Sequence, residues 1–478
     1  MITNRTFAAA TTALATSALL AAAPAAHAQN QTASQNPNVI VLLVDDLGIS
    51  DLACYGAQHG NTYHETPNID KLAAQGMRFT NAYATCPVCS PTRASLVTGK
   101  YPTRTRITDY IAGEPQPTNR KVLTHNTHAR LELREFLVSE AFKEAGYFTI
   151  FAGKWHLGWE CFGPTDQGFD VNIAGKMWGR PRGRGTYNYP FDMPNLPGEP
   201  GDYLTNRITD EVIKQIESSV ANDKPFFCYL SFYQVHTPLV PDKNDFAHFN
   251  NKPKTKRWKN QKYASMVYTM DRNVGRIMDT LKQQGVDDNT IILFTSDNGG
   301  LRGVTSNYPY RAGKGNIYEG GIREPLIIRW PGVVQPGSIS DQITTSTDVY
   351  PTLLQAAGLK LRPKQHKDGV SLVPVLKQEV EKLDRDTIYW HFPHFRGNAP
   401  KMPAGAVRSG DFKLIEDYET GSLELYNLKT DIAEKNNLAE QMPEKAYELQ
   451  KMLADWRVQT GALMPQPNPT YKPKSRKK

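Results

Sequence analysis

Four short apolar runs along the chain are each followed by charged or polar residues. The runs cover residues 39–44, 148–152, 226–232 and 291–294, and no charged side chain interrupts them. Buried strands of a parallel sheet are typically continuous in their apolar character rather than alternating. Ligands of open α/β sheets bind beyond the carboxyl ends of the strands. We therefore predict four parallel strands that share one site at their carboxyl ends.

Each run ends close to residues that can bind an ion or move a proton. They are, in chain order, Asp45, Asp46, Lys154, His156, His236, Asp297 and Asn298. Residues two apart on an extended chain face the same side, so Lys154 and His156 can point into one site. Each residue also has an ordinary interpretation: the aspartate pair as a solvated turn, Asn298 as half of an Asn-Gly turn, and His156 as a structural histidine. Their shared position at strand ends is what favours a site.

Helical periodicity separates the predicted strands. Residues 203–218 and 263–284 carry apolar side chains at helical spacing, and Gly285 ends the second segment. Strands that alternate with helices are typical of βαβ units. The fold class that we predict is α/β, with a large, mostly parallel sheet flanked by helices.

The pattern changes after about residue 376. Short strand-like segments separated by turn residues follow, at residues 388–392, 405–408, 412–415 and 423–428. A helix over 443–458 turns Ala446, Leu449, Leu453 and Trp456 to one face. We expect a main domain over 37–375, a smaller C-terminal α+β domain with an antiparallel sheet over 376–465, and a basic tail over 466–478.

The first residues have the features of an export signal. An Ala- and Leu-rich stretch over 7–23 precedes Ala26-His27-Ala28, which offers a small-x-small cleavage pattern. A membrane-spanning helix is disfavoured, because the apolar stretch is short and Pro24 follows it. We expect a signal peptide over 1–28, a linker over 29–36, and an exported protein, periplasmic or extracellular, with no membrane anchor.

Charge narrows the class of ligand. The net charge is +8, and five of the cations crowd the last seven residues as Lys472, Lys474, Arg476, Lys477 and Lys478. A solvated basic tail explains that segment, while a positive surface also attracts a polyanionic substrate. The chain has no helix-turn-helix, finger or RNA-binding motif, so nucleic acid is not the expected partner.

The cysteine content excludes a disulfide scaffold. The five cysteines are Cys54, Cys86, Cys89, Cys161 and Cys228, which is few for 478 residues. An odd number in an exported protein leaves at least one thiol unpaired or chemically altered. The pattern does not fix how Cys54, Cys86, Cys161 and Cys228 would pair.

Residues 89–99, Cys-Ser-Pro-Thr-Arg-Ala-Ser-Leu-Val-Thr-Gly, form the most informative segment. Ser90 is a good N-cap and Pro91 suits the first helical position, so Cys89 would lie just before a helix N-terminus. That end of a helix favours an anionic group. Two other interpretations remain: Cys86 and Cys89 as a C-x-x-C redox pair, and Cys89 as an inert core thiol. Neither explains Pro91, Arg93 or the Thr98-Gly99 ending.

The segment resembles the signature C-x-P-x-R-x4-T-G of formylglycine-dependent (type I) sulfatases, members of the alkaline-phosphatase-like superfamily. Lys100 follows the glycine where arginine is more common. The resemblance implies that a formylglycine-generating or anaerobic sulfatase-maturating enzyme oxidises Cys89 to an aldehyde, whose hydrate is the nucleophile. It also implies an alkaline-phosphatase-like fold, with 37–375 as the catalytic sulfatase domain.

The other motifs of that family follow in order. Gly153-Lys154-Trp155-His156 resembles its lysine-histidine motif, His236 its second histidine, and Lys314 its second lysine. The residues that resemble its metal site are Asp45, Asp46, Asp297 and Asn298, with the formylglycine from Cys89. Adjacent carboxylates are costly unless a cation neutralises them, and oxygen ligands favour calcium over zinc or copper. One calcium ion is therefore expected.

The resemblance also implies a role for each residue. Lys154 and Lys314 would bind sulfate oxygens, and His236, helped by Lys314, would protonate the departing alcohol. His156 would deprotonate the second hydroxyl of the hydrate, which a plain cysteine lacks. Arg93 would orient residue 89.

The substrate and the rival functions are open at this stage. The motif style and Trp390-His391-Phe392-Pro393-His394 resemble bacterial exported arylsulfatases and polysaccharide sulfatases, which suggests galactose or N-acetylgalactosamine sulfate in a polysaccharide or glycosaminoglycan. His391, His394 and Arg396 are candidates for contacting the sugar, although a structural role explains them equally well. The alternatives are a phosphonate monoester or phosphodiester hydrolase of the same superfamily, a non-catalytic binder of sulfated glycans, and a thiol-disulfide oxidoreductase.

Overall fold

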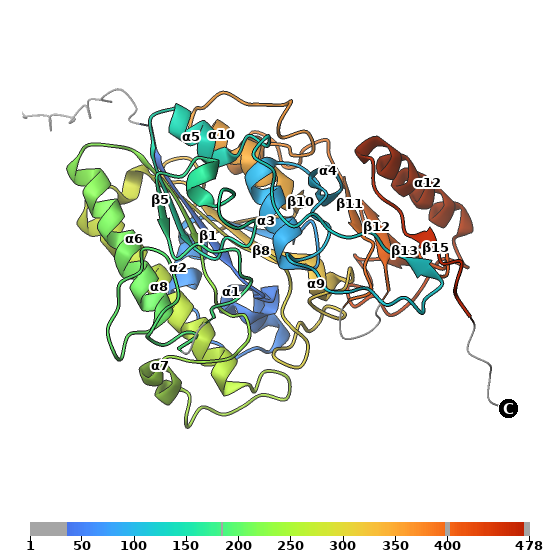
Figure 1. Ribbon diagram of the computed structural model, residues 1–478, viewed down its shortest axis with the longest axis horizontal. Helices are drawn as coiled ribbons and strands as arrows, with labels where there is room; N and C mark the ends of the chain where they lie inside the picture. The colour runs from blue at the N-terminus through green and yellow to red at the C-terminus, as the bar shows by residue number, and fades with distance from the viewer. Residues whose placement is uncertain (1–35, 183–184, 397–401, 473–478) are drawn as a thin grey trace, which may run out of the picture. The chain divides into compact units, whose positions relative to one another are not determined.

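The structure, a computed structural model, describes residues 36–182, 185–396 and 402–472 (Figure 1). The expected signal peptide, the linker up to residue 35 and the end of the basic tail from residue 473 lie outside the described residues. Among the helices of the described part, none is both long and apolar enough to cross a membrane.

A nine-stranded sheet is the centre of the larger part of the protein. Its strands are β1 (Asn38–Val44), β2 (Met77–Tyr83), β4 (Phe148–Gly153), β5 (Val171–Ile173), β6 (Phe226–Ser231), β7 (Thr290–Ser296), β8 (Arg323–Arg329), β9 (Ser338–Ser340) and β10 (Thr344–Thr345). Strand β8 runs antiparallel to its neighbours β2 and β7. The spatial order is β10-β2-β8-β7-β1-β6-β4-β5, with β9 beside β2. Strands β7, β1, β6 and β4 are neighbours and mutually parallel. The predicted mostly parallel sheet is confirmed.

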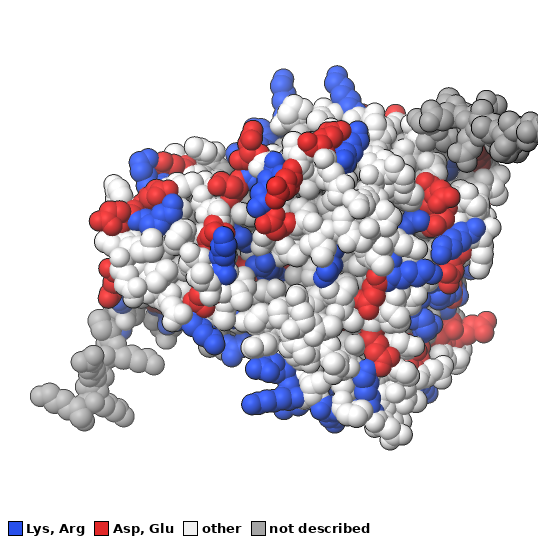
Figure 2. Space-filling view, turned by 180° about the vertical axis from the view of Figure 1, so that it is seen from behind, with Lys and Arg blue, Asp and Glu red and all other residues white. Residues whose placement is uncertain are grey.

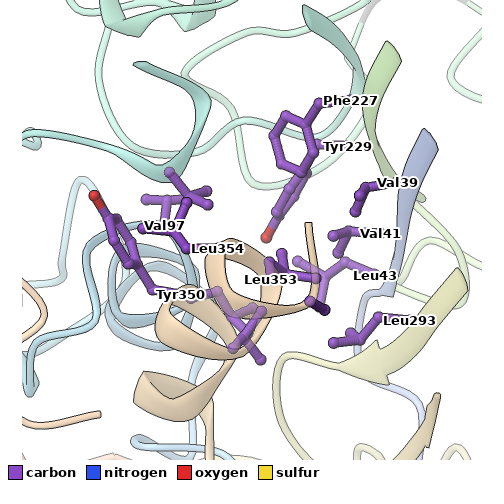
Figure 3. Close-up of a cluster of buried hydrophobic side chains, with 14 of the residues drawn as sticks. Val39, Val41, Leu43, Val97, Phe227, Tyr229, Leu293, Tyr350, Leu353 and Leu354 are labelled. Carbon is purple, nitrogen blue, oxygen red and sulfur yellow. The ribbon is translucent and has the colours of Figure 1, made fainter. Parts of the chain in front are cut away.

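Helices cover both faces of this sheet (Figure 1). Helices α3 (Cys89–Thr98), α5 (Val138–Glu144) and α10 (Val349–Ala356) pack on one face, and α2 (Pro67–Gln75), α6 (Leu204–Ala221) and α8 (Gln261–Gln283) on the other. Alternate residues of β1 explain the division, since neighbouring side chains of a strand point to opposite faces. Val39, Val41 and Leu43 face the first group of helices, as Figure 3 shows beside Leu353 and Leu354.

The C-terminal sheet is antiparallel, as predicted. Its order is β11 (Thr387–Phe392), β12 (Ala404–Ser409), β13 (Phe412–Asp417) and β14 (Leu423–Asn427), and α12 (Pro443–Thr460) packs on it. Its other face shares a core with Tyr83, Val88 and Ile322 of the larger part. Because one core joins the two sheets, residues that follow β2 and residues near β11 can belong to one site.

The remaining elements are short connections. They are the helices α1 (Ala53–Gly56), α4 (Pro102–Thr105), α7 (Lys243–His248), α9 (Glu319–Ile322) and α11 (Val373–Leu376), and the paired strands β3 (Val122–Leu123) and β15 (Gln466–Pro467).

Candidate functional site

Cys89 opens helix α3 at the carboxyl edge of the large sheet. Its Sγ lies 3.5 Å from Asp45 Oδ1, just beyond β1, and 3.5 Å from Lys314 Nζ. The helix begins two residues earlier than we predicted: Val88 is the N-cap and Cys89 the first helical residue, so the prediction of Ser90 as N-cap is wrong. The Ser90 hydroxyl instead donates to the carbonyl of His156 and accepts from the amide of Ile111. Long-range bonds have replaced the local cap.

Two lysines neutralise the aspartate pair. Lys154 Nζ donates to Asp45 Oδ2 at 2.7 Å, and Lys314 Nζ lies 2.6 Å from Asp46 Oδ1. Lys154 directly follows β4, whereas Lys314 lies on the long connection between β7 and β8. The structure therefore brings four predicted residues from three distant segments around the Cys89 thiol.

Arg93 fixes the base of the site from within α3. Its guanidinium donates through Nε to Asp297 Oδ2 at 2.8 Å and through Nη1 to the carbonyl of Lys154 at 2.9 Å. A further bond reaches Ser231 Oγ at the end of β6. Because Arg93 is buried and bonded to the ends of β4, β6 and β7, it ties the helix to the strand ends that carry the other groups.

The same residues are suited to holding a cation. Asp45, Asp46, Cys89 and His236 offer ligand atoms that lie within 4.8 Å of one another. Asn298 donates through Nδ2 to Asp46 Oδ1 at 2.8 Å, while its Oδ1 is buried with no hydrogen-bond partner. Asp297 Oδ1 accepts from the amide of Asp46. A buried, unpartnered amide oxygen beside carboxylates is a ready oxygen ligand, so the donor set fits calcium.

The two predicted histidines differ in their surroundings. His236 Nε2 is 3.7 Å from Asp46 Oδ2, and its Nδ1 contacts the carbonyl oxygen of Thr237. The extended backbone that we expected up to His156 is not observed: β4 ends at Gly153, and His156 has φ of 57°. Its Nε2 contacts the carbonyl of Ile111, and its buried Nδ1 has no partner. One nitrogen of His156 is therefore available to a ligand.

Burial shapes the electrostatics of the group. Burial raises the pKa of Asp45 to about 7 against the opposing effect of Lys154, and it raises the pKa of Cys89 to about 12. Burial, with Lys314, lowers the pKa of His236 to about 3. For His156, burial and Lys154 hold the pKa well below its usual range. A thiol with so high a pKa stays protonated at neutral pH and is a weak nucleophile.

The three candidate sugar contacts lie elsewhere, around the small sheet. His391 Nδ1 lies 2.9 Å from the Tyr418 hydroxyl, and its Nε2 lies 3.1 Å from the carbonyl of Leu463. His394 Nε2 lies 2.9 Å from Thr108 Oγ1. Both rings are buried; the two bonds of His391 fit a structural role, whereas His394 Nδ1 has no hydrogen-bond partner.

Arg396 is linked to the predicted site by a chain of contacts. It binds Asp109 with two nitrogens, at 2.8 Å and 2.6 Å, and stacks over the Tyr110 ring at 4.3 Å. The Tyr110 ring in turn lies 6.4 Å from the His156 ring. Arg396 therefore reaches the site through Tyr110.

Sequence reasoning missed the residues that hold the His156 ring. They are Ile111, whose carbonyl contacts Nε2, and Gly179, where an added Cβ would lie 2.7 Å from Cε1 of the ring. Gly179 belongs to the Gly-rich segment 179–185. Glycines allow the backbone to approach another group closely, but the sequence does not indicate that this group is His156. Nothing local to Ile111 indicates its role.

The chain is similar in sequence to proteins of a known family. Residues 37–359 match the family model described as Sulfatase, and residues 312–459 match one described as N-sulphoglucosamine sulphohydrolase, C-terminal. A sulfatase of Formosa agariphila is 33% identical, with 90% of each chain covered. The N-acetylgalactosamine-6-sulfatase of Homo sapiens is 32% identical over 75% of this chain and 69% of its own.

Solved structures show the same fold. One described as Ps i-CgsB in complex with k-i-k-neocarrahexaose has a TM-score of 0.75 and 29% identity, with 91% of this chain and 95% of that chain covered. Another, in complex with its substrate D-glucosamine-2-N,6-O-disulfate, has a TM-score of 0.71 and 25% identity, with 89% and 98% covered. The chain belongs to the sulfatase family and is a sulfuric ester hydrolase.

Proposed function

We propose that this sulfatase hydrolyses sulfate esters of a sulfated carbohydrate by means of formylglycine at position 89 and one bound calcium ion. The observation that carries the proposal is the setting of Cys89. Its Sγ is 3.5 Å from a carboxylate and 3.5 Å from an ammonium group, at the N-terminus of a buried helix. The thiol stands in for the hydrated aldehyde, whose oxygens would take its place.

Formylglycine and calcium would supply part of the chemistry, and the side chains of the protein supply the rest. When present, formylglycine supplies the nucleophilic oxygen and calcium, held by Asp45, Asp46, Asp297 and Asn298, offsets the sulfate charge. Lys154 and Lys314 bind the remaining sulfate oxygens. His236, helped by Lys314, protonates the leaving oxygen, and the open Nδ1 of His156 accepts a proton from the second hydroxyl of the hydrate. Arg93 keeps α3, and with it residue 89, aligned with the strand ends.

Maturation must precede folding in this scheme. Cys89 is only 2% exposed, and all ten residues of α3 are buried. A maturation enzyme, formylglycine-generating or anaerobic sulfatase-maturating, could not reach the thiol in the folded chain. Conversion during export, while the chain is extended, fits the predicted signal peptide over residues 1–28.

The relatives support sulfated carbohydrate as the substrate class. The similar proteins include an N-acetylgalactosamine-6-sulfatase, a complex with a neocarrahexaose and a complex with a glucosamine disulfate. Galactose or N-acetylgalactosamine sulfate within a polysaccharide or glycosaminoglycan is our specific proposal. Sulfated mono- and disaccharides of defined linkage would test it; equal rates on all of them would refute sugar specificity.

One experiment tests the central step. Active protein is digested with trypsin, and the peptide over residues 79–93 is fragmented to locate any change to Cys86 or Cys89. We expect formylglycine at 89 and an unaltered thiol at 86. Fully active protein with a thiol at 89 would overturn the mechanism. Rates on an aryl sulfate and an aryl phosphodiester, measured on the same sample, distinguish the proposal from a phosphodiester or phosphonate monoester hydrolase, which would prefer the second.

A further inference from the structure

A strongly basic loop precedes helix α8. This basic loop, residues 249–260, places five cations within the eight residues 252–259, namely Lys252, Lys254, Lys256, Arg257 and Lys259. All except Lys252 are exposed. Only Lys252 is paired, with Glu65; the other four form no ion pair with any carboxylate of the described residues. In Figure 2, Lys and Arg side chains gather along the lower edge of the face shown.

The basic loop is ordered rather than a solvated tail. Trp258 lies near its C-terminal end, is 2% exposed and packs with Tyr63 and Phe249. Thr255 and Trp258 close a turn, with the Thr255 amide donating to the Trp258 carbonyl at 3.0 Å and the Trp258 amide donating to Thr255 Oγ1 at 2.8 Å. Four positive charges on a fixed turn repel one another, which destabilises the loop unless an anionic ligand offsets the repulsion.

The loop is attached to the wall of a pocket. The Trp258 indole donates to the carbonyl of Ser306 at 3.0 Å, and Asn260 Nδ2 donates to that of Val304 at 3.1 Å. The pocket has a volume of about 510 Å³, and its lining includes Arg257, Ser306, Asn307, Tyr308, Arg311 and Ala312. The Arg257 guanidinium stacks over the Tyr308 ring at 3.7 Å. Arg311 is engaged by the Glu424 carboxylate and the Tyr426 hydroxyl, so the Arg257 guanidinium on its aromatic ring is the group suited to an anionic sugar unit.

Hydrogen bonds join the pocket lining to two segments of the candidate active site. Asn307 accepts from the amide of Gly300 at 3.1 Å and donates to the carbonyls of Gly300 and Ala312. The Lys314 amide donates to the same Gly300 carbonyl at 3.2 Å. Gly300 is two residues beyond Asn298, and Ala312 two before Lys314. A chain seated in the pocket would therefore border the groups around Cys89.

We propose that the basic loop and this pocket bind sulfate groups on neighbouring units of a sulfated polysaccharide whose scissile ester lies at residue 89. The inference rests on the proposed function and adds to it a preference for polymeric over monomeric substrate. Each exposed cation–sulfate contact is weak alone and is screened by salt, so the effect depends on several acting together.

The test measures binding and turnover separately. In a Cys89→Ala background, which prevents cleavage, dissociation constants for a chondroitin 6-sulfate hexasaccharide are measured at low and at high salt. The loop variant is Lys254→Gln, Lys256→Gln and Lys259→Gln. The matched control is Lys360→Gln, Lys364→Gln and Lys367→Gln, also exposed and unpaired among the described residues. The control segment contacts the far end of α3, where Gln365 bonds to Thr98.

We expect the loop variant to weaken hexasaccharide binding by about tenfold at low salt, with the difference shrinking at high salt. The control should stay within about twofold of the parent. With Cys89 intact, the KM for 4-nitrophenyl sulfate should be the same in both variants, and equal midpoints of thermal unfolding would establish that both are folded.

Two outcomes would overturn the inference. One is equal hexasaccharide affinity in the loop variant and the control. The other is that double-stranded DNA binds as tightly as the hexasaccharide and that its affinity falls as much in the loop variant. The loop would then be a general anion-binding surface. If the parent protein hydrolyses no sulfate ester at all, the proposed function fails, and the dissociation constants still decide the role of the loop.

Discussion

Two of the groups of buried charged side chains in the described residues differ in how completely they are satisfied, one beneath the small sheet and one at the carboxyl edge of the large sheet. In the first, Lys413 donates to Glu319 and Glu434, at 2.9 Å each. The second oxygen of Glu319 accepts from Tyr83 and Arg323, and that of Glu434 from the amide of Glu319. Every carboxylate oxygen of this closed network has a donor within the protein.

The group around Cys89 is also buried and contains cations and carboxylates, yet it is incomplete. Asn298 Oδ1 and His156 Nδ1 are buried without partners. Lys154 and Lys314 lie on single carboxylates that calcium could share. Buried polar groups are normally satisfied, so unpartnered ones mark a place for a ligand. The difference suggests that the closed network serves stability and the open one serves binding and chemistry.

Substitution of Cys89 should give the largest loss of activity with little loss of stability. We expect Cys89→Ala to lower kcat on an aryl sulfate by about 10⁶-fold, the scale of losing a nucleophile, with little change in the midpoint of thermal unfolding. Cys86→Ala is the matched control, since Cys86 is equally buried three residues away. It should keep the activity. A requirement for both cysteines would instead favour a redox pair.

Substitution of one lysine in each group tests the comparison directly. Lys413→Met leaves two buried carboxylates without their shared cation, which should cost about 3–5 kcal/mol of unfolding free energy. Lys314→Met should lower kcat about 10²–10³-fold by removing a charge that faces sulfate. Urea unfolding and aryl sulfate kinetics, measured in calcium for both variants, give the two values. Equal loss of stability in the two would contradict the contrast.

Calcium should stabilise the folded protein through the group around Cys89 and not through the closed network of Lys413. Calcium added to a chelated sample at about 100 times its dissociation constant should contribute about 2.7 kcal/mol to unfolding free energy, because only the folded state holds the site. Asp46→Asn should remove most of this gain. Asp271→Asn is the control, because Asp271 is a buried carboxylate that instead binds the amides at the start of α2. An unchanged gain in Asp46→Asn would refute the ligand assignment.

The sequence was most informative where function depends on strand ends. Asp45, Asp46 and Lys154 directly follow strands whose continuous apolar runs were evident, and adjacency in a parallel sheet then brings them together. Lys314 has no such signal, because it lies in a long connection and was identified only from its flanking residues. Ser231 and Ile111 act through contacts with residues 138 and 45 positions away, which no local pattern encodes.

The local geometry of the site was harder to predict than its composition. Strand β4 ended at Gly153, whose φ is 92°, so His156 does not lie on the strand as we had expected. The helix took Val88 as its N-cap, because the Ser90 hydroxyl is bonded to His156 and Ile111 instead. In both places tertiary contacts outweighed the local preference on which the prediction rested.

The smallest expected effect concerns histidines of the small-sheet region. Burial lowers the pKa of His391 to about 3 and that of His394 to about 4. Between these values and 6.5 the unfolded chain binds protons that the folded chain does not, so stability rises with pH and is lost on acidification. Each histidine should contribute about 1.4 kcal/mol per pH unit in that window.

His391→Asn should therefore flatten the dependence of unfolding free energy on pH between about 4 and 6.5, by about the slope of one histidine. His248→Asn is the control, because His248 is exposed and lies on α7, outside the small sheet. If His391 is structural, as its bonds to Tyr418 and Leu463 indicate, the KM for a sulfated disaccharide should not change at neutral pH. A raised KM with an unchanged pH dependence of stability would instead assign His391 to substrate binding. The ligand-binding region would then extend to the small sheet, which we have placed with the stabilising region.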